Sequence, residues 1–176
     1  MGLNSLKFGS WIERAAKAWA LLAGAVLLSI MAVTSLNTLS FLAGWVGQPL
    51  GVSVPTLSGY EDFVSLAIAM AALGFMPWCQ VQRGHIAIDL VADRLPKFMS
   101  TAMDQLWLIA LAALSIFLAV WLGIGMLEAR ADNALSPILG WPRWPFFAPG
   151  IVSLALWAAV CVSQLFAPTR AAEPQP

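Results

Sequence analysis

The chain has 176 residues, of which 60% are hydrophobic and only 10% carry a charge, and its formal net charge is zero. A soluble domain carries about 25% charged residues, so this composition excludes an ordinary water-soluble fold. Without an excess of positive charge, the chain also lacks the electrostatic basis for binding nucleic acid, and we predict no nucleic-acid partner.

Four long stretches of the sequence contain no Lys, Arg, Asp or Glu. Each is about 17 to 22 residues long, the length that a helix needs to cross a bilayer core of roughly 30 Å. Lipid offers no hydrogen-bond partners, so a backbone that crosses it must satisfy its own hydrogen bonds, and we expect these segments to be helices. The predicted spans are residues 18–39, 63–79, 106–127 and 146–166. We therefore predict an all-α membrane protein with four transmembrane helices in a single integral-membrane domain, residues 1–176.

The segment before the first span has an amphipathic pattern. Apolar residues recur at helical spacing from Leu3 to Trp19, and Lys7, Arg14 and Lys17 lie between them. This pattern predicts a short N-terminal helix in the membrane interface, with an interruption at Gly9. The apolar run that follows is longer than the 7 to 15 residues typical of a signal peptide, so we interpret it as a retained anchor.

Two loops are expected on the side opposite the termini. The first, residues 40–60, contains glycine and proline and is mostly apolar, so we expect it to pack against the membrane surface or another protein. The second, residues 128–145, is rich in proline and is expected to be stiff and irregular. Pro149 is expected in the first turn of the last helix, where proline is tolerated.

The distribution of basic residues predicts the orientation. One side of the predicted topology carries seven of the nine basic residues: Lys7, Arg14, Lys17, Arg83, Arg94, Lys97 and Arg170. The opposite side carries only Arg130 and Arg143. The positive-inside rule therefore places both termini and the middle loop in the cytoplasm.

No cofactor or metal site is predicted. His85 is the only histidine, whereas haem between helices usually needs paired histidines and zinc needs three or four ligands. Cys79 and Cys161 both lie near the ends of apolar segments and are interpreted as packing residues.

The densest polar cluster follows the second span. His85 and Asp89 are one helical turn apart, and Asp93 and Arg94 follow. We predict a short interfacial helix whose acids pair with Arg83, with Arg94 or with a neighbouring subunit. An exposed ion pair contributes only about 0 to 1 kcal/mol, but one buried between subunits can decide partner choice. An intramembrane enzyme that uses the His85–Asp89 pair is one alternative function, although no Ser or Cys nucleophile is beside this pair in the sequence.

Glu61 and Asp62 open the second span from the outside. An acid in a membrane segment is a functional hypothesis by default, but acids at a helix N-terminus are also stabilised by the helix dipole. No ionisable residue lies deep inside any predicted span, whereas a self-sufficient carrier would usually have one. A stand-alone four-helix carrier or exporter, which would depend on Glu61, is therefore the second alternative.

Several of these motifs together resemble one known family. They are Glu61, the run from Leu73 to Pro77-Trp78, the segment Arg83-Gly84-His85-Ile86-Ala87-Ile88-Asp89-Leu90, the triplet Arg94-Leu95-Pro96, the triplet Gly140-Trp141-Pro142, and Pro149. From about residue 60 to 166 the chain resembles the small membrane subunit, the DctQ type, of tripartite ATP-independent periplasmic (TRAP) transporters. The long uncharged loop at residues 40–60 departs from the family, which often has an arginine and aromatic pair after span one.

The resemblance implies a function. Such a subunit lies in the bacterial inner membrane and braces a large permease subunit. That large subunit carries the transport path and the site of the coupling ion, commonly sodium. A periplasmic binding protein delivers a small organic acid, often a carboxylate. The residues that we expect to stabilise local structure or to contact the large subunit are Glu61, Trp78, Arg83, His85, Asp89, Asp93 and Arg94.

Overall fold

A computed structural model describes residues 3–48, 51, 55–82 and 97–166. Its helices are α1 (Leu3–Gly47), α2 (Tyr60–Gly74), α3 (Met76–Val81), α5 (Lys97–Ala131), the 3₁₀ helix η3 (Trp144–Phe147) and α6 (Ala148–Phe166). Within these ranges there is no strand, only an isolated bridge between Leu135 and Pro142. The prediction of an all-α fold is therefore confirmed.

Four segments are long and apolar enough to cross a membrane, as predicted. They are Ser10–Gly47, Tyr60–Val81, Thr101–Ala131 and Trp144–Phe166. Each predicted span lies inside one of these segments. Pro149 is the second residue of α6 and thus lies in its first turn, as expected.

Helix α1 is longer than the sequence predicted. Its 45 residues form one helix without a break at Gly9, and at 1.5 Å per residue it is about 67 Å long. The prediction of a loop from residue 40 was wrong, because the helix continues to Gly47. Single glycines cost a helix only about 1 kcal/mol each, and the first proline of the chain is Pro49. Whether the N-terminal part of α1 lies in the membrane interface stays a prediction.

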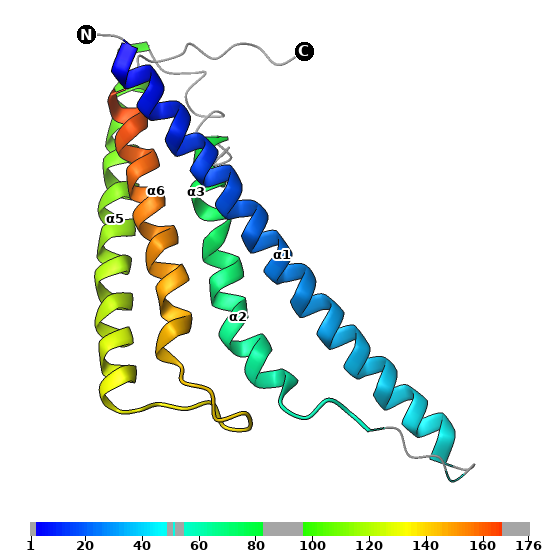
Figure 1. Cartoon of the computed structure of the whole chain (residues 1–176). Coiled ribbons are helices and arrows are strands. Elements are labelled where there is room, and N and C mark those ends of the chain that lie inside the picture. Colours follow the sequence, from blue (N-terminus) through cyan, green and yellow to red (C-terminus); the bar gives the residue numbers. More distant parts are fainter. Residues whose placement is uncertain (1–2, 49–50, 52–54, 83–96, 167–176) are drawn as a thin grey trace, which may run out of the picture.

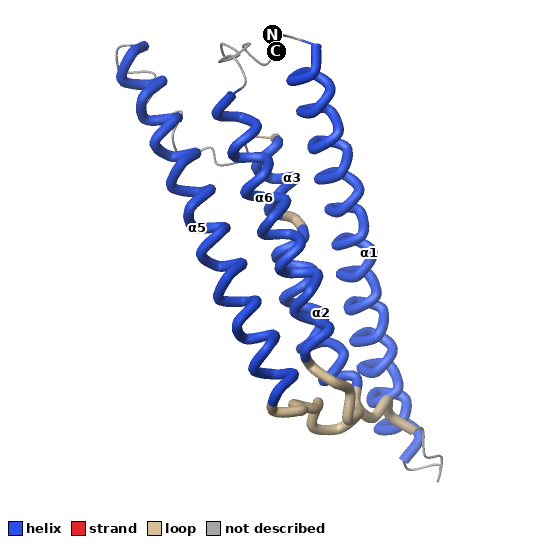
Figure 2. The backbone as a smooth tube through the Cα atoms, turned by 60° about the vertical axis from the view of Figure 1, so that its left-hand side comes forward, coloured by secondary structure: helices blue, strands red, loops and turns tan. Residues whose placement is uncertain are grey.

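Helix α6 is the centre of the bundle. It packs against α5, against α2 and α3, and against α1, whereas α1 and α5 share no substantial contact. Figures 1 and 2 show α5 and α1 on the two flanks, with α6 and the α2–α3 pair between them. In the most apolar window of α6, 39% of residues are buried, compared with 17% for α1 and for α5. The two flanking helices therefore present most of their surface outward.

The described interior contains three small apolar clusters, each at a contact between helices. The first joins α5 to α6 through Leu111, Ala112, Leu154, Trp157 and Cys161. The second joins α1 to α6 through Ile12, Ala16 and Val160, and the third joins α1 to α2 through Ile30, Ala67 and Ala71. The many alanines in these clusters let the helices approach closely, as is typical of packing in lipid.

The second span is interrupted between α2 and α3. Pro77 has no N–H group, so it cannot bond to the carbonyl of Leu73 four residues earlier. The hydroxyl of Ser153 on α6 donates to this carbonyl, which also receives the N–H of Phe75. On the other side, a Cβ at Gly74 would overlap with the Cβ of Ala23 on α1. The interruption is therefore held from both sides, by α6 and by α1.

Candidate functional site

Two of the residues predicted as contact sites lie in the described part of the chain. Glu61 is exposed in the first turn of α2. Trp78 is half-buried on α3 and packs against the cluster that joins α1 to α6. Trp78 therefore contributes to the internal packing of the subunit. The remaining predicted residues, Arg83, His85, Asp89, Asp93 and Arg94, lie outside the described residues, as does the interfacial helix predicted there.

Asp62, the neighbour of Glu61, connects α2 to the loop between α5 and η3. Its side chain is only 4% exposed, and its Oδ2 atom accepts the N–H groups of Ile138 at 2.8 Å and Leu139 at 2.7 Å. The N-cap of α2 is Gly59, which provides no side-chain cap. Asp62 thus binds a neighbouring loop and makes no capping bond to its own helix. Because hydrogen bonds to a carboxylate are about twice as strong as neutral ones, this contact fixes the loop firmly.

The loop is itself tightly folded. The N–H of Ser136 donates to the carbonyl of Trp141 at 2.8 Å, and the N–H of Trp141 donates back to the Ser136 hydroxyl at 3.0 Å. Leu139 then covers Gly59, where an added Cβ would lie 2.6 Å from the Leu139 Cδ2 atom. Gly59 also has a φ of +86°, which side chains rarely adopt. We call this arrangement, formed by Gly59, Asp62, Ser136, Ile138 and Leu139, the loop latch.

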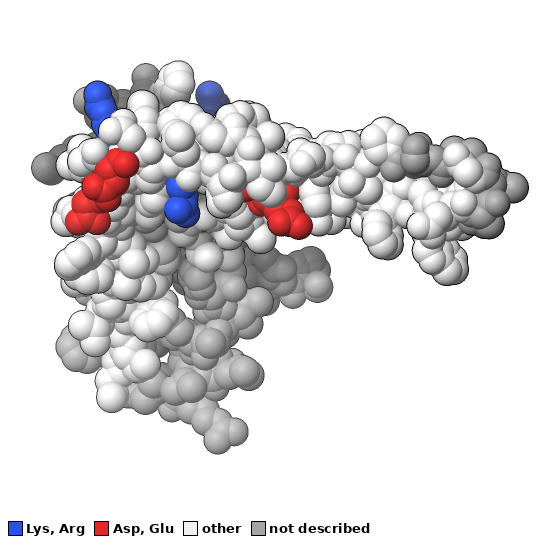
Figure 3. All heavy atoms as spheres, turned by 90° about the horizontal axis from the view of Figure 1, so that it is seen from below, with Lys and Arg blue, Asp and Glu red and all other residues white. Residues whose placement is uncertain are grey.

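The loop latch holds apolar side chains outward at the end of the bundle. The exposed large residues of this loop are Leu135, Ile138, Leu139 and Trp141. Leu57, on the neighbouring segment, is also exposed, and its N–H donates to the Asn37 side chain of α1 at 3.1 Å. We call the four loop residues and Leu57 the outer-loop patch. Figure 3 views this end of the molecule, where charged side chains are sparse and α1 projects to one side. Exposed apolar groups at a helix end indicate contact with a protein or a membrane.

At the other end of the bundle, buried polar groups are paired with one another. The Gln80 side chain of α3 donates to the Gln164 side chain of α6 at 2.9 Å, and Gln164 donates to the Gln80 carbonyl at 3.0 Å. The Trp157 indole N–H points at the Gln80 side-chain oxygen at 3.3 Å. These bonds join α3 to α6, and they occupy the side-chain amides of both glutamines.

Metal ligands do not cluster in the described part of the chain: no group of three or more His, Cys, Asp or Glu residues could hold a metal ion there. Cys161 is buried in the α5–α6 cluster and Cys79 is half-buried, in agreement with packing roles.

These features define a multi-pass membrane protein. In the residues that the structure describes, the buried polar side chains are hydrogen-bonded within the chain, and the outer helices present apolar flanks. The chain belongs to the DctQ component family of the tripartite ATP-independent periplasmic transporters, whose family model matches residues 51–171. The resemblance seen in the sequence is thus confirmed, and the chain is a small permease component of a TRAP transporter. No curated protein and no solved structure matches it. The whole of α1 precedes the matched region.

The sequence analysis did not predict the contacts that organise this site. Pro77 entered the sequence analysis only as part of the family motif, and the bond from Ser153 to the Leu73 carbonyl was not predicted. Asp62 was recognised as an acid at a helix N-terminus, whereas its partner is a loop more than seventy residues later. Gln80 and Gln164 were polar residues near span ends, and nothing in their spacing predicted that they pair.

Proposed function

We propose that this subunit braces the large permease subunit of the transporter and takes no direct part in moving the substrate. The observation that carries the proposal is that buried polar side chains are hydrogen-bonded within the chain. Ser153 is bonded to Leu73, and Gln80 is bonded to Gln164 and Trp157. A transport path needs polar groups that are free to replace the hydration of a solute or an ion.

The flanks of the bundle support a bracing role. Helix α1 is about twice as long as the roughly 30 Å bilayer core, and most of its large side chains point outward. A long helix that is packed on one side only offers a continuous surface to a second membrane protein. We infer that α1 or α5 contacts the large subunit, and that the Arg83–Lys97 segment contributes to the same contact or to local structure.

The outer-loop patch supports a second role, in docking the periplasmic binding protein. Its apolar side chains are exposed at the end of the bundle for which the positive-inside rule predicts a position on the periplasmic side of the membrane. The transported substrate would be a small organic acid, and its uptake would be coupled to an ion gradient, commonly of sodium, at sites on the large subunit. The complex would lie in the bacterial inner membrane, with both termini of this chain in the cytoplasm.

Reconstitution into liposomes tests the bracing role. We expect uptake of a carboxylate substrate only when this chain, the large subunit and the loaded binding protein are all present. Uptake by this chain alone would show a carrier, and equal uptake without it would show that it is dispensable. Either result would refute the proposal.

A variant tests the docking role separately. Ile138→Ser removes a 54% exposed side chain whose backbone N–H, not its side chain, belongs to the loop latch. We expect the two membrane subunits still to co-purify while uptake at limiting binding protein falls. Unchanged uptake would exclude this patch as the docking surface.

A further inference from the structure

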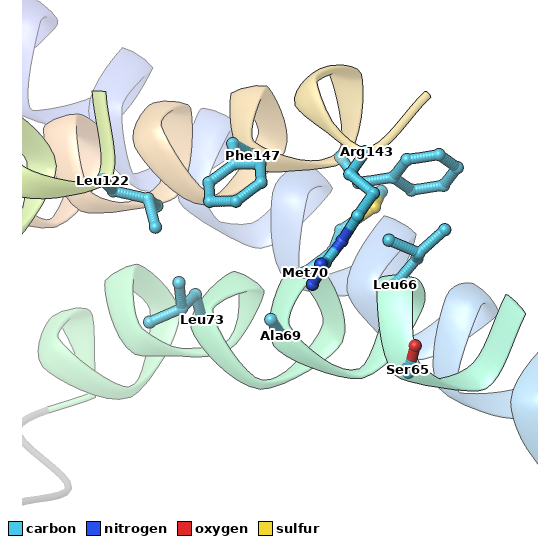
Figure 4. Close-up of a pocket in the computed structure, with 10 residues that line it drawn as sticks. Ser65, Leu66, Ala69, Met70, Leu73, Leu122, Arg143 and Phe147 are labelled. Carbon is cyan, nitrogen blue, oxygen red and sulfur yellow. The ribbon is translucent and has the colours of Figure 1, made fainter. Parts of the chain in front are cut away.

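A cleft of about 170 Å³ lies between α2 and the start of the fourth span. Leu66 and Met70 of α2 line one side, and Leu122 of α5 and Phe147 of η3 line the other (Figure 4). The cleft opens to the surface of the bundle, because Ser65, Ala69 and Arg143 in its lining are exposed. An enclosed apolar cavity of about 150 Å³ is large enough to bind a small apolar molecule such as benzene. The cleft therefore has the size and chemistry to hold part of an apolar chain.

One cation lies at this cleft. Figure 4 shows the Arg143 guanidinium reaching from the start of η3 toward Met70 and Ala69 of α2. Its backbone is fixed, because the Arg143 N–H donates to the carbonyl of Ala134 at 3.0 Å. In the part of the chain that the structure describes, the guanidinium makes no ion pair or hydrogen bond. Asp62, at the start of α2, is bound to the loop instead.

The other arginine of the same loop region provides a contrast. The Arg130 guanidinium lies 5.4 Å from the centre of the Trp144 ring, a distance at which a cation is attracted to an aromatic face. Arg130 thus has a contact within the chain, whereas Arg143 faces an apolar cleft. A guanidinium at the end of a membrane span normally finds an anion or the headgroup region.

The lining of the cleft decides between two kinds of anion. A protein carboxylate would bring its peptide N–H and carbonyl groups, which need hydrogen-bond partners that an apolar lining does not provide. Two polar side chains line the cleft, those of Arg143 and Ser65. The Ser65 hydroxyl already donates to the carbonyl of Asp62 at 3.2 Å. A phospholipid brings one phosphate, which a guanidinium binds with two parallel hydrogen bonds, and an apolar chain that needs no polar partner.

We propose that this cleft binds one phospholipid, with its phosphate on the Arg143 guanidinium and the first part of an acyl chain between α2 and Phe147. Of the residues that line the site, Leu122 alone belongs to a flanking helix assigned to the large subunit, and its side chain is half-buried. The site is also independent of the proposed function, because a phosphate has the same chemistry in either leaflet.

Native mass spectrometry of the full-length chain, titrated with palmitoyl-oleoyl-phosphatidylglycerol in mild detergent, tests the site. Arg143→Gln removes the phosphate contact, and Ala69→Phe fills the cleft without changing any charge. Arg143→Gln should weaken binding of the first phospholipid about tenfold, since a hydrogen bond to a charged group is worth roughly 1.5 kcal/mol or more. Ala69→Phe should weaken it by a similar factor, because its ring would occupy the space of the acyl chain. The matched controls are Arg130→Gln and Ala72→Phe, because Ala72 is exposed on α2 and lies outside the lining. Both should bind as the parent chain does.

Circular dichroism should show unchanged helix content in all four variants, so that a loss of lipid reports on the site. Equal binding by the parent chain and Arg143→Gln would overturn the proposal, as would normal binding by Ala69→Phe. A third result would also overturn it. If Arg143→Gln keeps the lipid but loses the large subunit on co-purification, the guanidinium serves a protein carboxylate.

Discussion

The loop latch gives the most direct test of the structural reasoning. In Asp62→Asn the side chain keeps its shape but loses the negative charge that holds the N–H groups of Ile138 and Leu139. A hydrogen bond to a charged group contributes about 1.5–3 kcal/mol and a neutral one about 0.5–1.5 kcal/mol. The two bonds together should therefore weaken by about 2 kcal/mol, after allowance for partial exposure of the loop.

Hydrogen exchange measured by mass spectrometry can detect this change in a peptide covering residues 134–144. A loss of about 2 kcal/mol corresponds to a roughly thirtyfold faster exchange of the two amides. Exchange in α5 and α6 should stay unchanged, because Asp62 bonds only to the loop. The matched control is Glu61→Gln, which removes the neighbouring, exposed acid. If exchange in Asp62→Asn is as slow as in the parent chain, or if both variants accelerate it equally, the Asp62 carboxylate does not hold the loop.

Two further predictions concern the interruption of the second span. Ser153→Ala removes the hydroxyl that donates to the Leu73 carbonyl, so the free energy of unfolding should fall by about 1 kcal/mol. The matched control Ser163→Ala should have little effect, because the Ser163 hydroxyl bonds within its own helix. A thermal unfolding series in detergent would measure both, and equal midpoints would contradict the role of Ser153. Gly74→Leu should cost about 1–3 kcal/mol in the same assay, since its side chain would collide with α1, whereas Gly123→Leu meets open space and should be tolerated. Equal tolerance of the two leucines would show that α1 does not press on Gly74.

The sequence predicted the fold well because lipid restricts the choices so strongly. A charge-free stretch of about twenty residues can cross the membrane only as a helix or as part of a barrel. The end of α1 was less predictable. Gly44 and Gly47 were interpreted as loop residues, but glycine alone does not end a helix, and the apolar run continues to the neighbourhood of Pro49.

The contacts of the site were harder to predict than the helices that carry them. Asp62 meets Ile138 and Leu139 because the loop folds back on itself around Ser136, and such a turn has no periodic signature. Pairing across helices depends on their rotation about their own axes, which an evenly apolar span does not determine. Gln80 and Gln164 are an example: both were visible as polar residues, and only the packing of α3 on α6 brings them together.

The separation of α1 from α5 has a practical consequence for mapping the assembly. A reactive probe on one flank cannot be confused with a probe on the other, because α6 and the α2–α3 pair lie between them. Leu28 on α1 and Ile116 on α5 both point outward and would accept a single cysteine for photochemical or disulfide trapping. The native thiols are half-buried or buried and would give little background. Cross-linking from α1 and from α5 in separate experiments can therefore identify the protein that contacts each flank in the cell membrane.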